Sequence, residues 1–162
     1  VTSQEDWTLA QRCLLACAAA NEFVTLFGTT IIFATWPLIV SKSYGLTLHQ
    51  IAFVIAAWPV AAFCVTPFFP SVVSLLGVAT SVLVGNLGSA LSDIVFMQSQ
   101  DWLVMALCHG VRGAFSSLAY NALLTHTSSV FAIPSKMCAF HAYCSAASQT
   151  GALIGQALGG VL

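Results

Sequence analysis

The chain has 162 residues, of which 59% are hydrophobic and only 6% are charged, and its formal net charge is −1. Soluble domains carry about a quarter charged residues, so this composition excludes an ordinary soluble domain, and the near-zero charge excludes a nucleic-acid-binding surface. Residues 43–92, 113–135 and 137–162 contain no Asp, Glu, Lys or Arg. Uncharged apolar runs of about 18 residues or more can cross a bilayer. The sequence therefore predicts an all-α, multi-pass membrane protein that contacts the lipid bilayer.

Five spanning helices fit between the polar stretches, after an N-terminal segment over residues 1–12. The expected spans are about 13–40, 50–70, 79–98, 102–125 and 137–162. The first is expected to break late, at Trp36-Pro37. In the second, Pro59 and Pro67 are expected to produce kinks, which spanning helices tolerate when neighbours satisfy the freed carbonyls.

The connections carry the information about topology. The stretch "SVVSLLGV" at 71–78 is expected to be a tight connection, and "SSVFAIPSK" is expected to link the fourth span to the fifth. Arg12 and Lys136 would lie on one side of the membrane and Lys42 on the other, so the charge count predicts a cytoplasmic N-terminus. The last span stops at Leu162 with no loop after it, which suggests a fragment of a longer protein.

The last span has glycines at a regular spacing. In "GALIGQALGG", Gly151, Gly155, Gly159 and Gly160 match every glycine of the pattern G-x-x-x-G-P-x-x-G-G, and Gln156 takes the place of the proline. This pattern resembles the fifth-helix motif of proton-driven antiporters of the major facilitator superfamily.

Other segments support the same resemblance. Residues 45–53, "GLTLHQIAF", are similar to the family's G-L-S-x-x-Q-I-G, and Arg112 stands where the fourth helix carries a buried arginine, with His109 as an alternative register. The similarity covers about residues 12–162 and is nearest to the vesicular amine and polyamine branch of the drug–proton antiporters. It implies an N-terminal six-helix half truncated before its sixth helix, a plasma-membrane or vesicle-membrane location, and a missing C-terminal half as partner.

One connection departs from the family. The loop after the second helix usually reads G-x-x-x-D-R-x-G-R-K and forms a charged latch, but here only Gly77 remains. The other places are occupied by Pro70, Ser74, Leu75, Val78 and Ala79. Either the latch is dispensable or the protein no longer cycles, and the sequence leaves both open.

Polar residues within the spans are the candidate site. Glu22 lies about ten residues, or roughly 15 Å, into the first span, where a carboxylate normally faces a cavity or a partner. With Asn21 it could bind a cationic solute or a proton; a later helix start would instead leave Glu22 solvated at the interface. Arg112 could hold an anion, pair with Glu22 or bond backbone carbonyls, and His109 could relay protons or donate between helices. One stripe of the fourth span is expected to face a cavity: Asp101, Met105, His109, Arg112, Ser116 and Leu123.

Small residues predict how the last span packs. Helices in lipid associate through close backbone contact, which small side chains permit. One face carries His141, Ser145, Ser148, Ala152, Gly155 and Gly159. The resemblance implies that this face lies against a helix of the missing half. The six cysteines are expected to be small buried packing residues, although Cys13, near the membrane edge, is also a candidate for palmitoylation. Asp93 is expected to cap its helix or to reach water.

No paired carboxylates, nucleophilic triad or metal-ligand spacing occurs, so the sequence predicts no enzyme, no cofactor and no metal site. The leading hypothesis is a multi-pass secondary transporter for a small organic solute such as a cationic amine, moved by proton-coupled export or antiport through alternating access. The alternative is a membrane interaction or scaffold protein derived from a transporter but no longer transporting.

Overall fold

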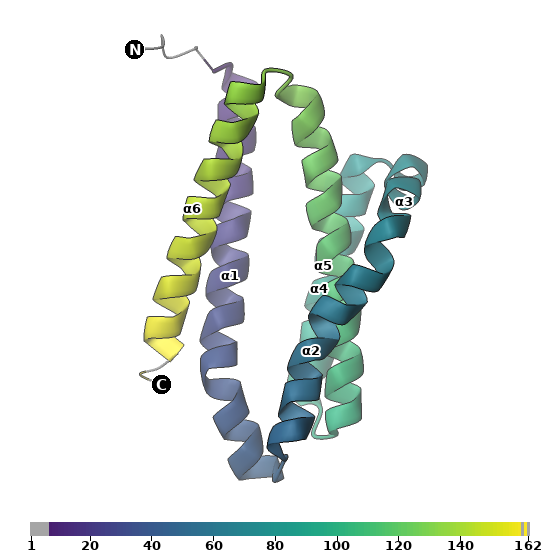
Figure 1. Ribbon diagram of the computed structural model, residues 1–162, viewed down its shortest axis with the longest axis vertical. Helices are drawn as coiled ribbons and strands as arrows, with labels where there is room; N and C mark the ends of the chain where they lie inside the picture. Colours follow the sequence, from purple (N-terminus) through teal and green to yellow (C-terminus); the bar gives the residue numbers. More distant parts are fainter. Residues whose placement is uncertain (1–6, 160, 162) are drawn as a thin grey trace. The chain divides into compact units, whose positions relative to one another are not determined.

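The computed structural model describes residues 7–159 and 161, nearly all of which are helical (Figure 1). The helices are α1 (Leu9–Tyr44), α2 (Leu48–Val65), the 3-10 helix η1 (Thr66–Phe68), α3 (Phe69–Leu76), α4 (Val78–Gln98), α5 (Trp102–Val130) and α6 (Pro134–Gly159). No β-strand occurs within the described residues. The predicted all-α class is therefore confirmed.

Three helical stretches of the described chain are long and apolar enough to cross a membrane: Leu9–Tyr44, Leu48–Leu76 and Val78–Gln98. Large apolar side chains cover their outer surfaces; Phe63 is 82% exposed and Leu75 is 83% exposed. Such exposure suits contact with lipid and would be costly in water. The helices α5 and α6 are as long but richer in Gly, Ser, Thr and His, so they do not join this group.

The helix α1 is longer than predicted. The break expected at Trp36-Pro37 is wrong, because α1 continues through Pro37 to Tyr44. A proline inside a helix removes one backbone hydrogen bond without ending the helix when packing holds both sides. Trp36 and Val40 are buried on either side of Pro37 and supply that packing.

The region after α2 also differs from the prediction. The helix α2 runs unbroken through Pro59, and Pro67 lies in η1, where the helix narrows. The tight connection expected over 71–78 is wrong, because residues up to Leu76 are helical and the turn is made by Gly77 at φ 78°. Four buried side chains explain why α3 folds against α5: Phe69, Val73, Leu118 and Ala122 form one hydrophobic cluster.

The connections around α5 are shorter than expected. The helix α5 extends to Val130 and α6 begins at Pro134, so the predicted linker reduces to residues 131–133. Proline suits the first turn of a helix because its missing N–H has no partner there anyway.

Asp101 caps the start of α5. Its Oδ1 accepts the Leu103 N–H at 2.8 Å, as a helix cap does. Asp101 therefore belongs to the helix start and not to a cavity-facing stripe.

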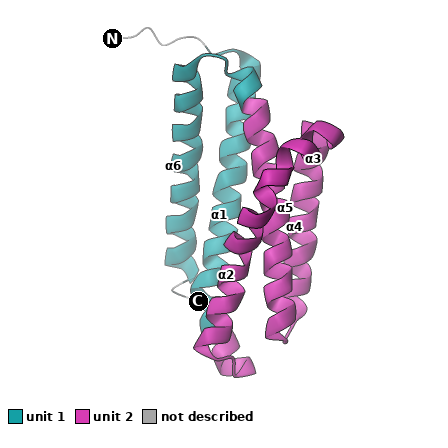
Figure 2. Ribbon diagram, turned by 45° about the vertical axis from the view of Figure 1, so that its right-hand side comes forward, with its two compact units in different colours: residues 1–39, 128–162 teal, residues 40–127 magenta. Residues whose placement is uncertain are grey.

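The chain divides into two compact units, coloured separately in Figure 2. The first comprises most of α1 together with α6, within residues 1–39 and 128–162. Gly151 of α6 contacts Phe23 of α1, and Gly155, one turn further along α6, contacts Phe27, one turn further along α1. The two helices are therefore parallel.

The second unit, residues 40–127, holds the helices α2 to α4 and most of α5. Here α4 and α5 are antiparallel, since Asp93 pairs with Arg112 while Phe96 packs on His109.

Candidate functional site

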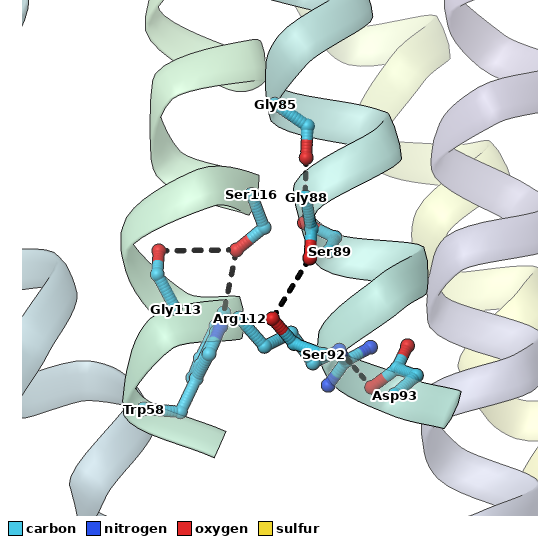
Figure 3. Close-up of polar contacts among 9 residues, drawn as sticks. All are labelled: Trp58, Gly85, Gly88, Ser89, Ser92, Asp93, Arg112, Gly113 and Ser116. Carbon is cyan, nitrogen blue, oxygen red and sulfur yellow. Dashed lines mark hydrogen bonds and ion pairs between the residues drawn. The ribbon is translucent and has the colours of Figure 1, made fainter. Parts of the chain in front are cut away.

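Two opposite charges meet between α4 and α5 in the second unit (Figure 3). Arg112 Nε lies 2.9 Å from Asp93 Oδ1. The Arg112 side chain is only 14% exposed, whereas the Asp93 side chain is 46% exposed. The guanidinium is thus enclosed within the unit while the carboxylate reaches its surface. Charges within spanning segments are costly and mark functional sites by default, which makes this pair the candidate site.

Glycines on both sides of Arg112 let the helix backbones come close. A Cβ atom added at Gly85 of α4 would lie 2.6 Å from the Phe115 carbonyl oxygen of α5. One added at Gly113, next to Arg112, would overlap the Trp58 carbonyl of α2. Helices in lipid associate through such backbone contact. The Gly85 contact brings α4 near enough to α5 for Asp93 and Arg112 to touch, and the Gly113 contact brings α2 against α5.

Hydroxyl groups near the pair are already hydrogen-bonded. Ser92 and Ser89 donate through Oγ to carbonyls one turn earlier in α4, at 2.8 and 2.9 Å. Ser116 Oγ of α5 accepts the Trp58 Nε1–H of α2 at 3.1 Å (Figure 3). Serine in a helix commonly satisfies itself on its own backbone. The Trp58–Ser116 hydrogen bond therefore links α2 to α5, and the Asp93–Arg112 pair links α4 to α5 about one turn away along α5.

His109 lies one turn before Arg112 on α5 and is buried. It is 5% exposed, and its ring centroid is 5.6 Å from that of Phe96 on α4. Met105, one further turn away, is 2% exposed. This part of the predicted stripe is consequently packed inside the unit, whereas Ser116 is half-buried. The histidine sits in the α4–α5 interface beside the charged pair.

The other predicted site residues lie in the first unit. Glu22 of α1 is half-buried. Asn21 beside it is exposed. The sequence left Glu22 open as a carboxylate partner for Arg112, but the carboxylate that Arg112 contacts is Asp93. Glu22 is therefore a second acidic position, in the first unit, whereas the ion pair belongs to the second unit.

The glycine face of α6 lies against α1 of the same unit. A Cβ atom at Gly159 would lie 2.7 Å from the Ile31 carbonyl oxygen, and one at Gly155 would lie 2.6 Å from that of Phe27. Gly151 makes the same kind of contact with Phe23. The expectation that this face waits for a helix of another half is thus wrong, because α1 already occupies it. Gln156 is exposed, and Gly160 lies outside the described residues.

The cysteines are not core residues. Cys13, Cys17, Cys64 and Cys138 are exposed, and the other two are half-buried. The prediction of buried packing thiols is therefore wrong. Their side chains face outward because alanine and glycine fill the tight helix contacts instead.

Sequence reasoning missed the role of Asp93. The sequence predicts that Asp93 caps its helix or reaches water; the side chain is half-exposed, but it also pairs with Arg112 of α5. One signal could have found it: Asp93 is the only charged residue between Lys42 and Asp101. A single acid in so long an apolar stretch needs a partner, and Arg112 is the one basic residue in the following span.

Within the described part of the chain, no three His, Cys, Asp or Glu side chains gather closely enough to hold a metal ion. The charged chemistry of the site rests on one carboxylate and one guanidinium, with an imidazole nearby. Comparison with protein-family models, with curated proteins and with solved structures found no match to this chain.

Proposed function

We propose that this membrane protein is part of a secondary transporter in which all five long helices span the bilayer and a small organic solute is exchanged for protons. The observation that carries the proposal is the Asp93–Arg112 pair, because Asp93 lies on α4, a helix apolar enough to cross a membrane. Ionisable residues at such positions typically line solute or proton pathways. The resemblance of the α6 glycines to those of proton-driven antiporters points the same way.

The unequal exposure of the pair suggests the charge of the solute. Asp93 is the accessible member, and Arg112 is enclosed behind it. A cationic amine or a proton can therefore approach the carboxylate and compete with the guanidinium for it. Glu22, half-buried on α1, offers a second carboxylate for the same class of ligand. Both features favour a cation over an anion as the solute.

Transport by the full-length protein tests the proposal. The protein is reconstituted in liposomes with an outwardly directed proton gradient, and uptake of labelled monoamines and polyamines is measured. We expect saturable, gradient-dependent uptake that falls at least tenfold in Asp93→Asn and in Arg112→Gln. Loss of binding energy of about 1.4 kcal/mol is enough for such a change.

Asp101→Asn is the matched control. It removes the same charge from an exposed helix cap, and asparagine caps a helix as well as aspartate does. We expect uptake within about twofold of wild type in this variant. Uptake that is unchanged in Asp93→Asn and Arg112→Gln, with normal expression, would overturn the assignment of the site.

A second candidate function is a membrane interaction protein that does not cycle. It is favoured by α3, where Ser74 and Leu75 occupy positions at which the resembling family carries charges, and where the turn retains only Gly77. Without the charged residues of this loop, a transporter loses one set of contacts that controls its change between inward-open and outward-open states. Absence of saturable uptake of every amine tested, with the ion pair intact, would favour this function.

A further inference from the structure

Four of the six cysteines belong to the first unit: Cys13, Cys17, Cys138 and Cys144. All lie in the N-terminal halves of α1 or α6, and three of them are exposed: Cys13, Cys17 and Cys138. A thiol that neither packs in the core nor pairs with another thiol remains available for chemistry. The depth of these thiols in the membrane decides which reagents can reach them.

The charges of α1 set that depth. Arg12 and Lys42 stand near opposite ends of the helix, and both are exposed. Thirty residues of α-helix measure about 45 Å, which matches the thickness of a bilayer including its headgroups. The helix is therefore long enough to place Arg12 and Lys42 in the two headgroup regions. Cys13 follows Arg12 directly, and Cys17 lies one turn deeper, about 7 Å below Arg12 along the helix.

The register of the two helices brings Cys138 to the same level. Gly151, Gly155 and Gly159 each contact the carbonyl of the α1 residue 128 positions earlier. By the same offset, Cys138 lies level with Ala10, close to the depth of Arg12.

Two contacts tie this end of the unit together. Gln11 Nε2 donates to the Val130 carbonyl at 3.3 Å, and the Trp7 and Phe131 rings are 5.4 Å apart. Three exposed thiols consequently share one membrane edge.

We propose that Cys13, Cys17 and Cys138 are S-acylation sites that accept long-chain fatty acyl groups. The donor is a fatty acyl-coenzyme A thioester, which inserts its chain in the bilayer and keeps its thioester at the interface. The cysteine thiolate attacks the thioester carbonyl carbon, the bond to the coenzyme A sulfur breaks, and coenzyme A leaves as a thiol with the proton lost by the cysteine. No oxidant or reductant is needed.

The surroundings suit this modification. Arg12 and Lys136 place two basic residues at the same edge, which favours the cytoplasmic face, where acyl-coenzyme A is found. Ala16 and Ala20 are exposed on the same side of α1 as Cys17. Their small side chains leave room for an acyl chain along the helix. The inference does not depend on the proposed transport function.

Thioester-specific mass tagging tests it. The full-length protein is expressed in eukaryotic cells, free thiols are blocked, hydroxylamine cleaves thioesters, and each released thiol receives a polyethylene glycol maleimide. We expect one to three hydroxylamine-dependent tags on the wild type. The triple variant Cys13→Ser, Cys17→Ser, Cys138→Ser should lose these tags, and incorporation of an alkyne-bearing palmitate analogue should fall at least tenfold.

The cysteines of the second unit provide the control. Cys64→Ser combined with Cys108→Ser should keep the wild-type number of tags, although Cys64 is also exposed. If the triple variant is not recovered in the membrane, the single variants Cys13→Ala and Cys138→Ala should each lower the tagged fraction. A wild type without hydroxylamine-dependent tags, or a triple variant with undiminished tags, would overturn the proposal.

Discussion

The two units of this protein hold their helices together in different ways. In the first, α1 and α6 meet along a row of glycines, and one hydrogen bond crosses between their described middle segments, from Thr30 Oγ1 to the Ala152 carbonyl at 3.2 Å. In the second, glycine contacts are joined by an ion pair and by the Trp58–Ser116 hydrogen bond. Both units use close backbone approach, and the second also has the Asp93–Arg112 ion pair between two of its helices.

This difference separates packing from function. Backbone contact through glycine is enough to hold a helix pair in lipid, as α1 and α6 illustrate. The Asp93–Arg112 pair is therefore not required by helix association as such. Under the proposed function, Asp93 is the carboxylate that a cationic solute or a proton would approach.

The largest effect is expected from filling the glycine contact of the first unit. Gly155→Leu should lower the free energy of unfolding by about 3 kcal/mol or more, because its side chain would overlap Thr30 and the Phe27 carbonyl. The measurement is unfolding of the purified protein in mixed micelles.

Two controls accompany this variant. Gly28→Leu on α1 places the same side chain where nothing lies within 4 Å, and Leu158→Ala changes a residue that is 47% exposed. Both should change the free energy of unfolding by less than about 1 kcal/mol. Equal losses for Gly155→Leu and Gly28→Leu would contradict the packing model.

A smaller effect is expected from breaking the ion pair of the second unit. Asp93→Asn leaves the enclosed guanidinium without its carboxylate, and the half-exposed position of Asp93 limits the loss to about 2 kcal/mol. The double variant Asp93→Asn, Arg112→Gln should recover at least half of that loss, because no unpaired charge remains. A double variant as unstable as the sum of the single variants would mean that the pair does not couple.

The smallest effects are expected from the hydrogen bonds that cross between helices. Trp58→Phe removes the bond to Ser116 and should cost about 0.6 kcal/mol, the usual value in membranes. Thr30→Val should cost less, since Thr30 Oγ1 also bonds the Leu26 carbonyl of its own helix at 2.7 Å. The same unfolding assay compares them. A larger loss for Thr30→Val would show that the first unit depends on polar contact after all.

Much of the secondary structure could be predicted from the sequence, since helices occupy all five expected stretches. The errors fall where tertiary contacts act. The break at Pro37 was expected from local backbone chemistry, but Trp36 and Val40 pack across it. The sequence predicted a tight connection over residues 71–78, but Val73 holds α3 in the hydrophobic cluster.

The sequence by itself predicted a membrane protein and the approximate positions of its helices. Long uncharged apolar runs favour a bilayer, where a helix satisfies the hydrogen bonds of its own backbone. It also placed Gly155 and Gly159 on the face of α6 that packs, whereas Ser145 of the same expected face is exposed. Only the tertiary structure decided that α1 covers this face and that Arg112 pairs with Asp93. The physical reason is that periodicity defines a face but not its neighbour. In lipid, the neighbour is selected by which backbones can approach most closely.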